Sequence, residues 1–161
     1  DNFDNLIKNN LDAFIVKTIY NNNLKDANGW GGAKCVEMDN ELAMVIKAFE
    51  YLQKKGISII LSCHSQIVNF KDPSQPDYHR WSLDLPSRKD ADLRNRIINW
   101  SSATLFGTRE VEMDGKKVTS DSRVLKTQEH ATYDAKCRYT IPESIEFSYK
   151  TFKAEVEKAR K

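Results

Sequence analysis

Polar groups lie in or directly after two apolar runs that are typical of buried strands. Lys17 lies in the first run, which begins at Leu11, and His64 and Gln66 directly follow the second, residues 57–63. In an open α/β sheet, ligands bind at the carboxyl ends of the strands. His64 is therefore the best catalytic candidate, because a histidine or glutamine there could orient a water molecule or contact a phosphate. The alternative is a polar strand end that only hydrogen-bonds a loop.

Aromatic and basic side chains alternate just after a loop that contains two prolines. Tyr78, His79, Arg80 and Trp81 form this cluster, and Trp30 lies in a separate glycine-rich loop. Such side chains can stack on the bases of single-stranded DNA and hold its backbone, or contact a protein partner. The alternative is that they pack these loops onto the domain.

Two other kinds of chemistry are excluded by spacing. No pair of cysteines or histidines has the separation of a zinc site, so we predict no metal. Ser65 beside His64 does not form a nucleophile pair, because adjacent residues of an extended chain point to opposite sides.

Composition restricts the class of protein. The 161 residues are 40% hydrophobic and 30% charged, as expected for one globular domain. A net charge of +2 gives no global signature of nucleic-acid binding, so contact with DNA would need a local patch. Three cysteines without close spacing indicate reduced thiols in a cytoplasmic protein, and no apolar run is long enough to cross a membrane.

The first half of the chain is predicted to be a βαβ unit. Residues 11–19 read as a strand, after a short helix that the Asn9-Asn10 pair would end. A helix capped by Asp39 would run to Lys55 and stop at Gly56. The apolar run 57–63 would then be a buried strand, parallel to the first.

The second half predicts a helix and several shorter strands. The helix covers residues 88–98, with Ser87 as its cap and its arginines on a solvated face. Strands are expected at 103–108, 110–113, 116–119, 123–127 and 135–139, with a hairpin turn at Asp114-Gly115 and a final helix over 149–160. The fold class is therefore α/β, with parallel strands, a crossover helix and an antiparallel β extension.

Five segments, in this order, resemble the phage-encoded RecA-like P-loop nucleotide-binding proteins of single-strand annealing and recombination. They are FIVKTI at 14–19, LSCHSQ at 61–66, PDYHRW at 76–81, WSSATLF at 100–106 and AKCRYTIP at 135–142. The resemblance implies a RecA-like core over 1–142 that lacks the phosphate-loop strand, and a helical extension over 143–161.

Departures from the family pattern concern the phosphate and metal sites. No G-x-x-x-x-G-K-[ST] loop occurs, and the resemblance implies that such a loop lies upstream of Asp1. Lys17 stands where the family has the Walker B aspartate that holds Mg²⁺, although its stem could also pack in the apolar layer and bring the ammonium to solvent. The resemblance assigns Gln66, Lys136 and Arg138 to a nucleotide or a subunit interface. The chain is therefore not expected to hydrolyse ATP alone.

Two functions remain. In the first, the chain is a catalytically degenerate module of phage origin, complete as it stands. It needs no cofactor and binds a protein partner or itself, for example as an inhibitor of a host defence nuclease. In the second, it is the C-terminal part of a recombination ATPase that binds Mg-ATP and single-stranded DNA.

The missing phosphate-loop strand has a structural consequence. Strand 57–63 must pair directly with 103–108, or an open apolar edge favours a dimer.

Overall fold

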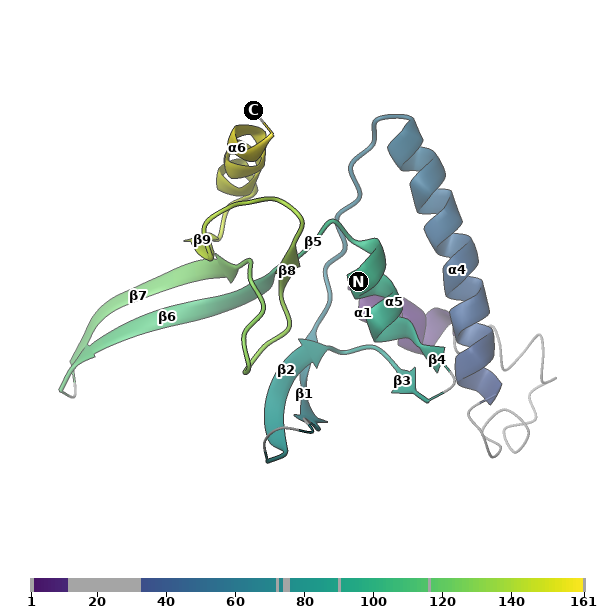
Figure 1. Cartoon of the computed structure of the whole chain (residues 1–161), viewed down its shortest axis with the longest axis horizontal. Coiled ribbons are helices and arrows are strands. Elements are labelled where there is room, and N and C mark those ends of the chain that lie inside the picture. The colour runs from purple at the N-terminus through teal and green to yellow at the C-terminus, as the bar shows by residue number, and fades with distance from the viewer. Residues whose placement is uncertain are drawn as a thin grey trace. The chain divides into compact units, whose positions relative to one another are not determined.

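The computed structural model describes residues 2–11, 33–71, 73, 76–89, 91–115 and 117–160. The chain folds into two compact units, Asp1–Gln66 with Leu83–Ile97 and Ile67–Ser82 with Ile98–Lys161. The helices in Figure 1 are α1 (Phe3–Asn5), the π-helix η1 (Leu6–Leu11), α4 (Ala33–Lys54), α5 (Leu93–Trp100) and α6 (Tyr149–Ala159). The strands are β1 (Ser65–Phe70), β2 (Tyr78–Leu83), β3 (Ser87–Arg88), β4 (Ala91–Asp92), β5 (Ala103–Thr104), β6 (Phe106–Asp114), β7 (Lys117–Lys126), β8 (Lys136–Cys137) and β9 (Ser144–Glu146).

Helix α4 supplies much of the core of the first unit. Cys35, Met38, Leu42 and Ile46 repeat at helical spacing and are all buried. The helix begins at Ala33, so the prediction that Asp39 caps it is wrong. The Asp39 carboxylate instead accepts hydrogen bonds from the guanidinium of Arg96.

The end of α4 is as predicted. Gly56 has φ 84°, a conformation that costs little only for glycine. Its N–H donates to the carbonyl of Gln53, and the N–H of Ile57 donates to the carbonyl of Leu52. These two bonds are the Schellman arrangement, which satisfies carbonyls at the end of a helix.

The N-terminal helix is longer than predicted. It continues through Asn9 and Asn10 and ends at Leu11, where the expected strand 11–19 would have begun. Phe3 and Ile7, one turn apart, are both buried and hold this helix on the unit. Residues 12–19 of the expected strand lie outside the described residues.

The run 57–63 is not the buried strand that its composition predicts. Residues 57–64 have no strand assignment, and the next strand begins at Ser65. Ile60 is 72% exposed and Ile57 is 49% exposed. The expected pairing with 103–108 is also wrong: Ala103 and Thr104 pair antiparallel with Cys137 and Lys136. A strand is stable only with a partner beside it, and an apolar run does not specify that partner.

Helix α5 begins later than expected. Ser87 and Arg88 form β3, which pairs with β4, so Ser87 is not the cap. Asp92 takes that place, because its carboxylate accepts from the backbone N–H of Asn95 at 3.1 Å. The solvated-face interpretation of this segment is wrong for Arg94, which donates to the carbonyl oxygens of Leu83 and Leu85.

An antiparallel sheet of order β6-β7-β9 dominates the second unit. The hairpin turn at Asp114-Gly115 is confirmed, with Gly115 at φ 58°. Each strand is longer than predicted, and 103–108 divides into the short β5 and the start of β6. The predicted strands 123–127 and 135–139 correspond to the end of β7 and to β8.

Helix α6 matches its prediction to within one residue. Ser148 caps it by accepting from the N–H of Thr151, and Val156 packs into the core of the second unit. The structure is thus mixed α/β, and each sheet register defined for the described residues is antiparallel. The parallel core stays a prediction.

Candidate functional site

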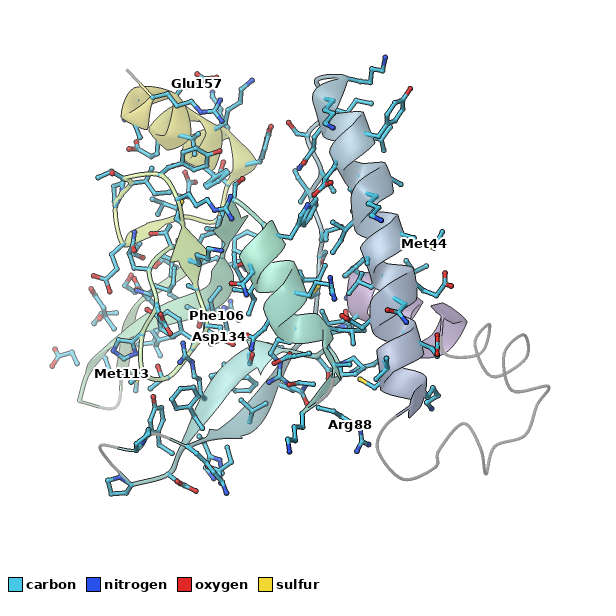
Figure 2. The ribbon with its side chains drawn as sticks, turned by 45° about the vertical axis from the view of Figure 1, so that its right-hand side comes forward. Met44, Arg88, Phe106, Met113, Asp134 and Glu157 are labelled. Atoms are coloured by element: carbon cyan, nitrogen blue, oxygen red, sulfur yellow. The ribbon has the colours of Figure 1, made fainter. Side chains whose placement is uncertain are left out.

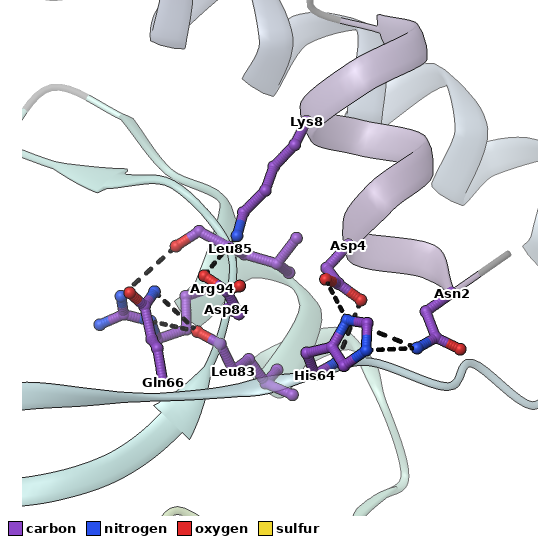
Figure 3. A network of polar contacts seen from close by, with 9 residues as sticks. All are labelled: Asn2, Asp4, Lys8, His64, Gln66, Leu83, Asp84, Leu85 and Arg94. Atoms are coloured by element: carbon purple, nitrogen blue, oxygen red, sulfur yellow. Dashed lines mark hydrogen bonds and ion pairs between the residues drawn. The ribbon is translucent and has the colours of Figure 1, made fainter.

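His64 is held by a buried carboxylate from the N-terminal helix. Asp4 is 1% exposed, and its Oδ2 lies 2.9 Å from His64 Nδ1. The other oxygen, Oδ1, accepts from the backbone N–H of His64 at 3.0 Å. Figure 3 shows both contacts, which join residues 60 positions apart in the sequence.

The contacts around the ring define its tautomer. Because a carboxylate can only accept, Nδ1 carries the proton that faces Asp4. The Asn2 amide nitrogen lies 3.0 Å from Nε2 and donates to it. Nε2 is therefore the basic atom of His64, and the side chain of Asn2 covers it.

Asp4 stays ionised in this setting. Burial alone would raise the pKa of its carboxyl group, but hydrogen bonds from the backbone N–H and the ring of His64 outweigh burial. The pKa of Asp4 consequently lies below its usual value of 3.8. An ionised carboxylate beneath an imidazole orients the ring, and here it leaves Nε2 facing Asn2.

Gln66 holds a neighbouring turn rather than presenting a free amide. Its side-chain nitrogen donates to the carbonyl of Leu83 at 3.3 Å, and Nε of Arg94 donates to the same oxygen at 3.1 Å. Lys8 forms an ion pair with Asp84 in the same turn. Figure 3 shows these contacts together: they brace the turn against the strand that begins after His64.

Lys136 and Arg138 converge on the end of helix α5. Nζ of Lys136 donates to the carbonyl of Ile98 at 2.8 Å, and a guanidinium nitrogen of Arg138 donates to the carbonyl of Asn99 at 2.8 Å. Burial, together with the charge of Arg138, lowers the pKa of Lys136. Both cations therefore satisfy helix carbonyls at the negative end of the helix dipole.

The cluster at 78–81 is divided between the two faces of β2. Arg80 is 5% exposed, with a guanidinium nitrogen 2.7 Å from Oε1 of Glu129 and Nε 2.8 Å from Oδ1 of Asp134. The second contact has ion-pair distance but lacks hydrogen-bond geometry. Tyr78 lies against Phe70, with ring centroids 5.3 Å apart. The packing interpretation therefore holds for Arg80 and Tyr78.

Trp81 lies on the other face and is 41% exposed. Its backbone is fixed, because its N–H donates to the carbonyl of Thr132 and its carbonyl accepts from the N–H of Asp134. Of the cluster, Trp81 is the side chain most available to a partner. Trp30 and Lys17 lie outside the described residues.

Asp4 is the main functional candidate that the sequence did not reveal. It is flanked on the helix by the buried apolar residues Phe3 and Ile7. A carboxylate on an apolar helix face must find a partner when buried, and this pattern was the available signal. Within the described ranges, no group of three or more His, Cys, Asp and Glu side chains could hold a metal ion.

A family comparison accounts for most of the chain. A family model described as an AAA domain matches residues 3–139. The chain belongs to this AAA domain family. Membership of this family indicates that the chain is a P-loop NTPase-like module, and modules of this class bind nucleotides. Comparison with curated proteins and with solved structures gives no match. In the described part of the AAA chain, no helix is long and apolar enough to cross a membrane.

Proposed function

We propose that this AAA chain is a binding module whose partner is a protein and that its own residues do not turn over ATP. The observation that carries the proposal is the placement of Lys136 and Arg138. The resemblance assigns both cations to a nucleotide or a subunit interface, but both donate to backbone carbonyls at the end of α5. These bonds hold Lys136 and Arg138 at the end of the helix, so moving either cation to a nucleotide elsewhere would cost the bonds it now makes, although both keep further N–H donors.

Other residues fit Mg-ATP no better. The sequence contains no phosphate-binding loop, and Gln66 is engaged by the carbonyl of Leu83. Lys17 would place a positive charge where the metal is expected. We further propose that the chain is of phage origin and acts in the cytoplasm of the host. A host defence nuclease is the first protein partner to test.

The test of this proposal is calorimetric titration of the chain with Mg-ATP, repeated with a Lys136→Met/Arg138→Met variant. We expect no saturable heat from either protein and a lower melting temperature for the variant, because the last carbonyls of α5 lose their donors. Micromolar binding of ATP that the variant abolishes would contradict the proposal. Inhibition of a purified defence nuclease in the same buffer tests the nature of the partner.

A second function is favoured by the family match and by the run 57–63. In this alternative, the chain is part of a recombination ATPase that binds single-stranded DNA, with ATP and Mg²⁺ as cofactors. The exposed Ile57 and Ile60 support it, because both side chains would be covered if residues 57–63 paired with a further strand in a buried sheet.

Fluorescence anisotropy with a labelled oligothymidine tests the DNA component. The alternative expects saturable binding that weakens several-fold in Trp81→Ala, since base stacking on an aromatic ring contributes about 1–3 kcal/mol. Tyr149→Ala, which removes an exposed aromatic ring of the second unit outside this cluster, is the matched control. No rise in anisotropy with the wild-type protein at any concentration would remove this function, and equal binding by all three proteins would remove Trp81 from the DNA contact.

A further inference from the structure

Strands β6 and β7 form a long hairpin, and in the described part of the chain no third strand pairs with most of its length. Strand β9 pairs only with Val124, Leu125 and Lys126. The hairpin beyond those residues, 109–123, is two-stranded, and we call it the arm. Figure 1 shows it as a long curved ribbon that ends at the hairpin turn. A two-stranded ribbon without a covering layer is only marginally stable by itself.

The two faces of the arm differ in chemistry. Residues directly opposite each other in an antiparallel pair project to the same face. One face, called the arginine face, carries the pairs Arg109↔Arg123, Val111↔Asp121 and Met113↔Val118. The other face carries Glu110↔Ser122 and Glu112↔Ser120.

The free end of the arginine face is apolar and open to solvent. Val111, Met113 and Val118 are 49%, 57% and 53% exposed. Figure 2 labels Met113 near the free end of the ribbon and Phe106 at its start. Three neighbouring apolar side chains on one face of a ribbon indicate a surface that a partner covers.

A second apolar group lies at the base of the same face. A Cβ atom at Gly107 would lie 2.7 Å from Cε2 of Phe147, so this ring lies over Gly107. Position 107 is in phase with Arg109 and Val111, which places Phe147 on the arginine face. The ring is nevertheless 56% exposed. The face is thus apolar at both ends and charged between them.

The charged middle is not balanced within the chain. Arg109 and Arg123 stand directly opposite each other, an arrangement that destabilises a strand pair. Asp121 forms an ion pair with Arg109 at 2.9 Å. Among the described residues, no ion pair engages Arg123, so this arginine is available to a carboxylate from outside.

We propose that the arginine face packs against the same face of a second copy of this chain, with the two arms running in opposite directions. The two-fold axis passes between two cross-strand pairs, Arg109↔Arg123 and Val111↔Asp121. It places each of these pairs opposite the other pair of the partner. It also places Gly107 opposite the partner's Met113. Arg123 then meets the partner's Asp121, and Met113 and Val118 meet the partner's Phe147. Charge complementarity and apolar cover are both obtained with one symmetric contact.

This interface does not depend on nucleotide binding. Every residue in it belongs to the second unit, and none is among the residues considered for a phosphate or for DNA. If the chain proves to bind ATP, the proposed dimer is not affected. If the chain proves to be monomeric, the proposed function is not affected.

Sedimentation velocity of the full chain, from about 1 µM to about 1 mM, tests the proposal over the affinity range of small interfaces. We expect a reversible monomer–dimer equilibrium. Asp121→Arg or Arg123→Asp alone should weaken the dimer at least about tenfold, because each places like charges across the contact. The double variant Asp121→Arg/Arg123→Asp should restore it, because the pair is re-formed with reversed signs.

Controls separate this contact from general effects of charge and folding. Glu112→Arg changes charge on the opposite face of the arm, on strand β6, and should leave the dimer intact. Circular dichroism and thermal melting check that each variant is folded. A chain that stays monomeric throughout the range would overturn the proposal, as would a dimer that both single variants leave unchanged or that the double variant fails to restore.

Discussion

Asp4 is a buried carboxylate, and its contacts with His64 offset the free energy of removing its charge from water. A buried carboxylate loses its hydration and needs donors in return. The backbone N–H and the ring of His64 supply two of them. We therefore expect the contact between Asp4 and His64 to stabilise the folded state of the first unit, whether or not Nε2 of His64 also has a chemical role.

A double-mutant cycle on Asp4→Asn and His64→Ala measures the strength of this contact. We expect a coupling free energy of about 1 kcal/mol, the typical net value for a hydrogen bond. The value is kept low because the His64 side chain is 56% exposed and water screens the pair. Urea unfolding of the four proteins gives the coupling. Additive effects of the two substitutions would show that the contact contributes no stability.

The pH dependence of stability follows from the same carboxylate. The pKa of Asp4 is lower in the folded chain than its ordinary value of 3.8. Its contribution is thus fully present above pH 3.8 and is lost as the pH falls through the folded-state pKa. The difference in unfolding free energy between wild type and Asp4→Asn should therefore shrink from pH 5 toward pH 2, measured by urea unfolding at each pH. Ser62→Ala, a neighbouring change without a carboxylate, should show no such convergence.

At the scale of elements, the end of α4 offers the clearest prediction. Gly56→Ala should reduce the unfolding free energy by about 1–2 kcal/mol, the cost of a left-handed conformation for a residue with Cβ. No atom lies within 4 Å of the position of that Cβ, so steric contact adds nothing. Gly56→Asn should cost less, because asparagine adopts this conformation more readily. Chemical denaturation distinguishes the two, and equal losses would contradict the backbone explanation.

Local signals predicted the elements that local chemistry determines. Gly56, the Asp114-Gly115 turn and helix α6 all depend on neighbours within a few residues, and each is found where it is expected. The start of α5 was misplaced because Ser87 and Asp92 are both good caps and the sequence does not say which is used. Residues 57–63 were misread because burial depends on partners that are distant in sequence.

The candidate site shows the same division. The sequence singled out His64 by its position after an apolar run, but it gave no link to Asp4, which the fold brings from 60 residues away. Arg80 was considered for a partner, and the structure buries it between Glu129 and Asp134. Lone residue types cannot distinguish a buried arginine from an exposed one. The contacts that decide the matter are tertiary.

For the whole molecule, family membership gives the class of module, and the structure gives its elements and contacts. The AAA domain match covers residues 3–139 and gives the class of module. The expected division at residue 142 into a core and a helical extension stays a prediction, as do the phage origin and the partner. Self-association would make the apparent stability depend on protein concentration, because binding of the folded state alone shifts the unfolding equilibrium.

The bond between Asp4 and His64 also bears on how the protein is made. A ribosome releases the N-terminal helix long before it releases the segment that completes it, since the two are 60 residues apart. Until His64 emerges, the carboxylate of Asp4 lacks the backbone and ring donors that His64 provides in the folded chain. The nascent chain therefore carries a helix whose buried-type carboxylate has no partner for several seconds at ordinary elongation rates, a period in which chaperones can bind it.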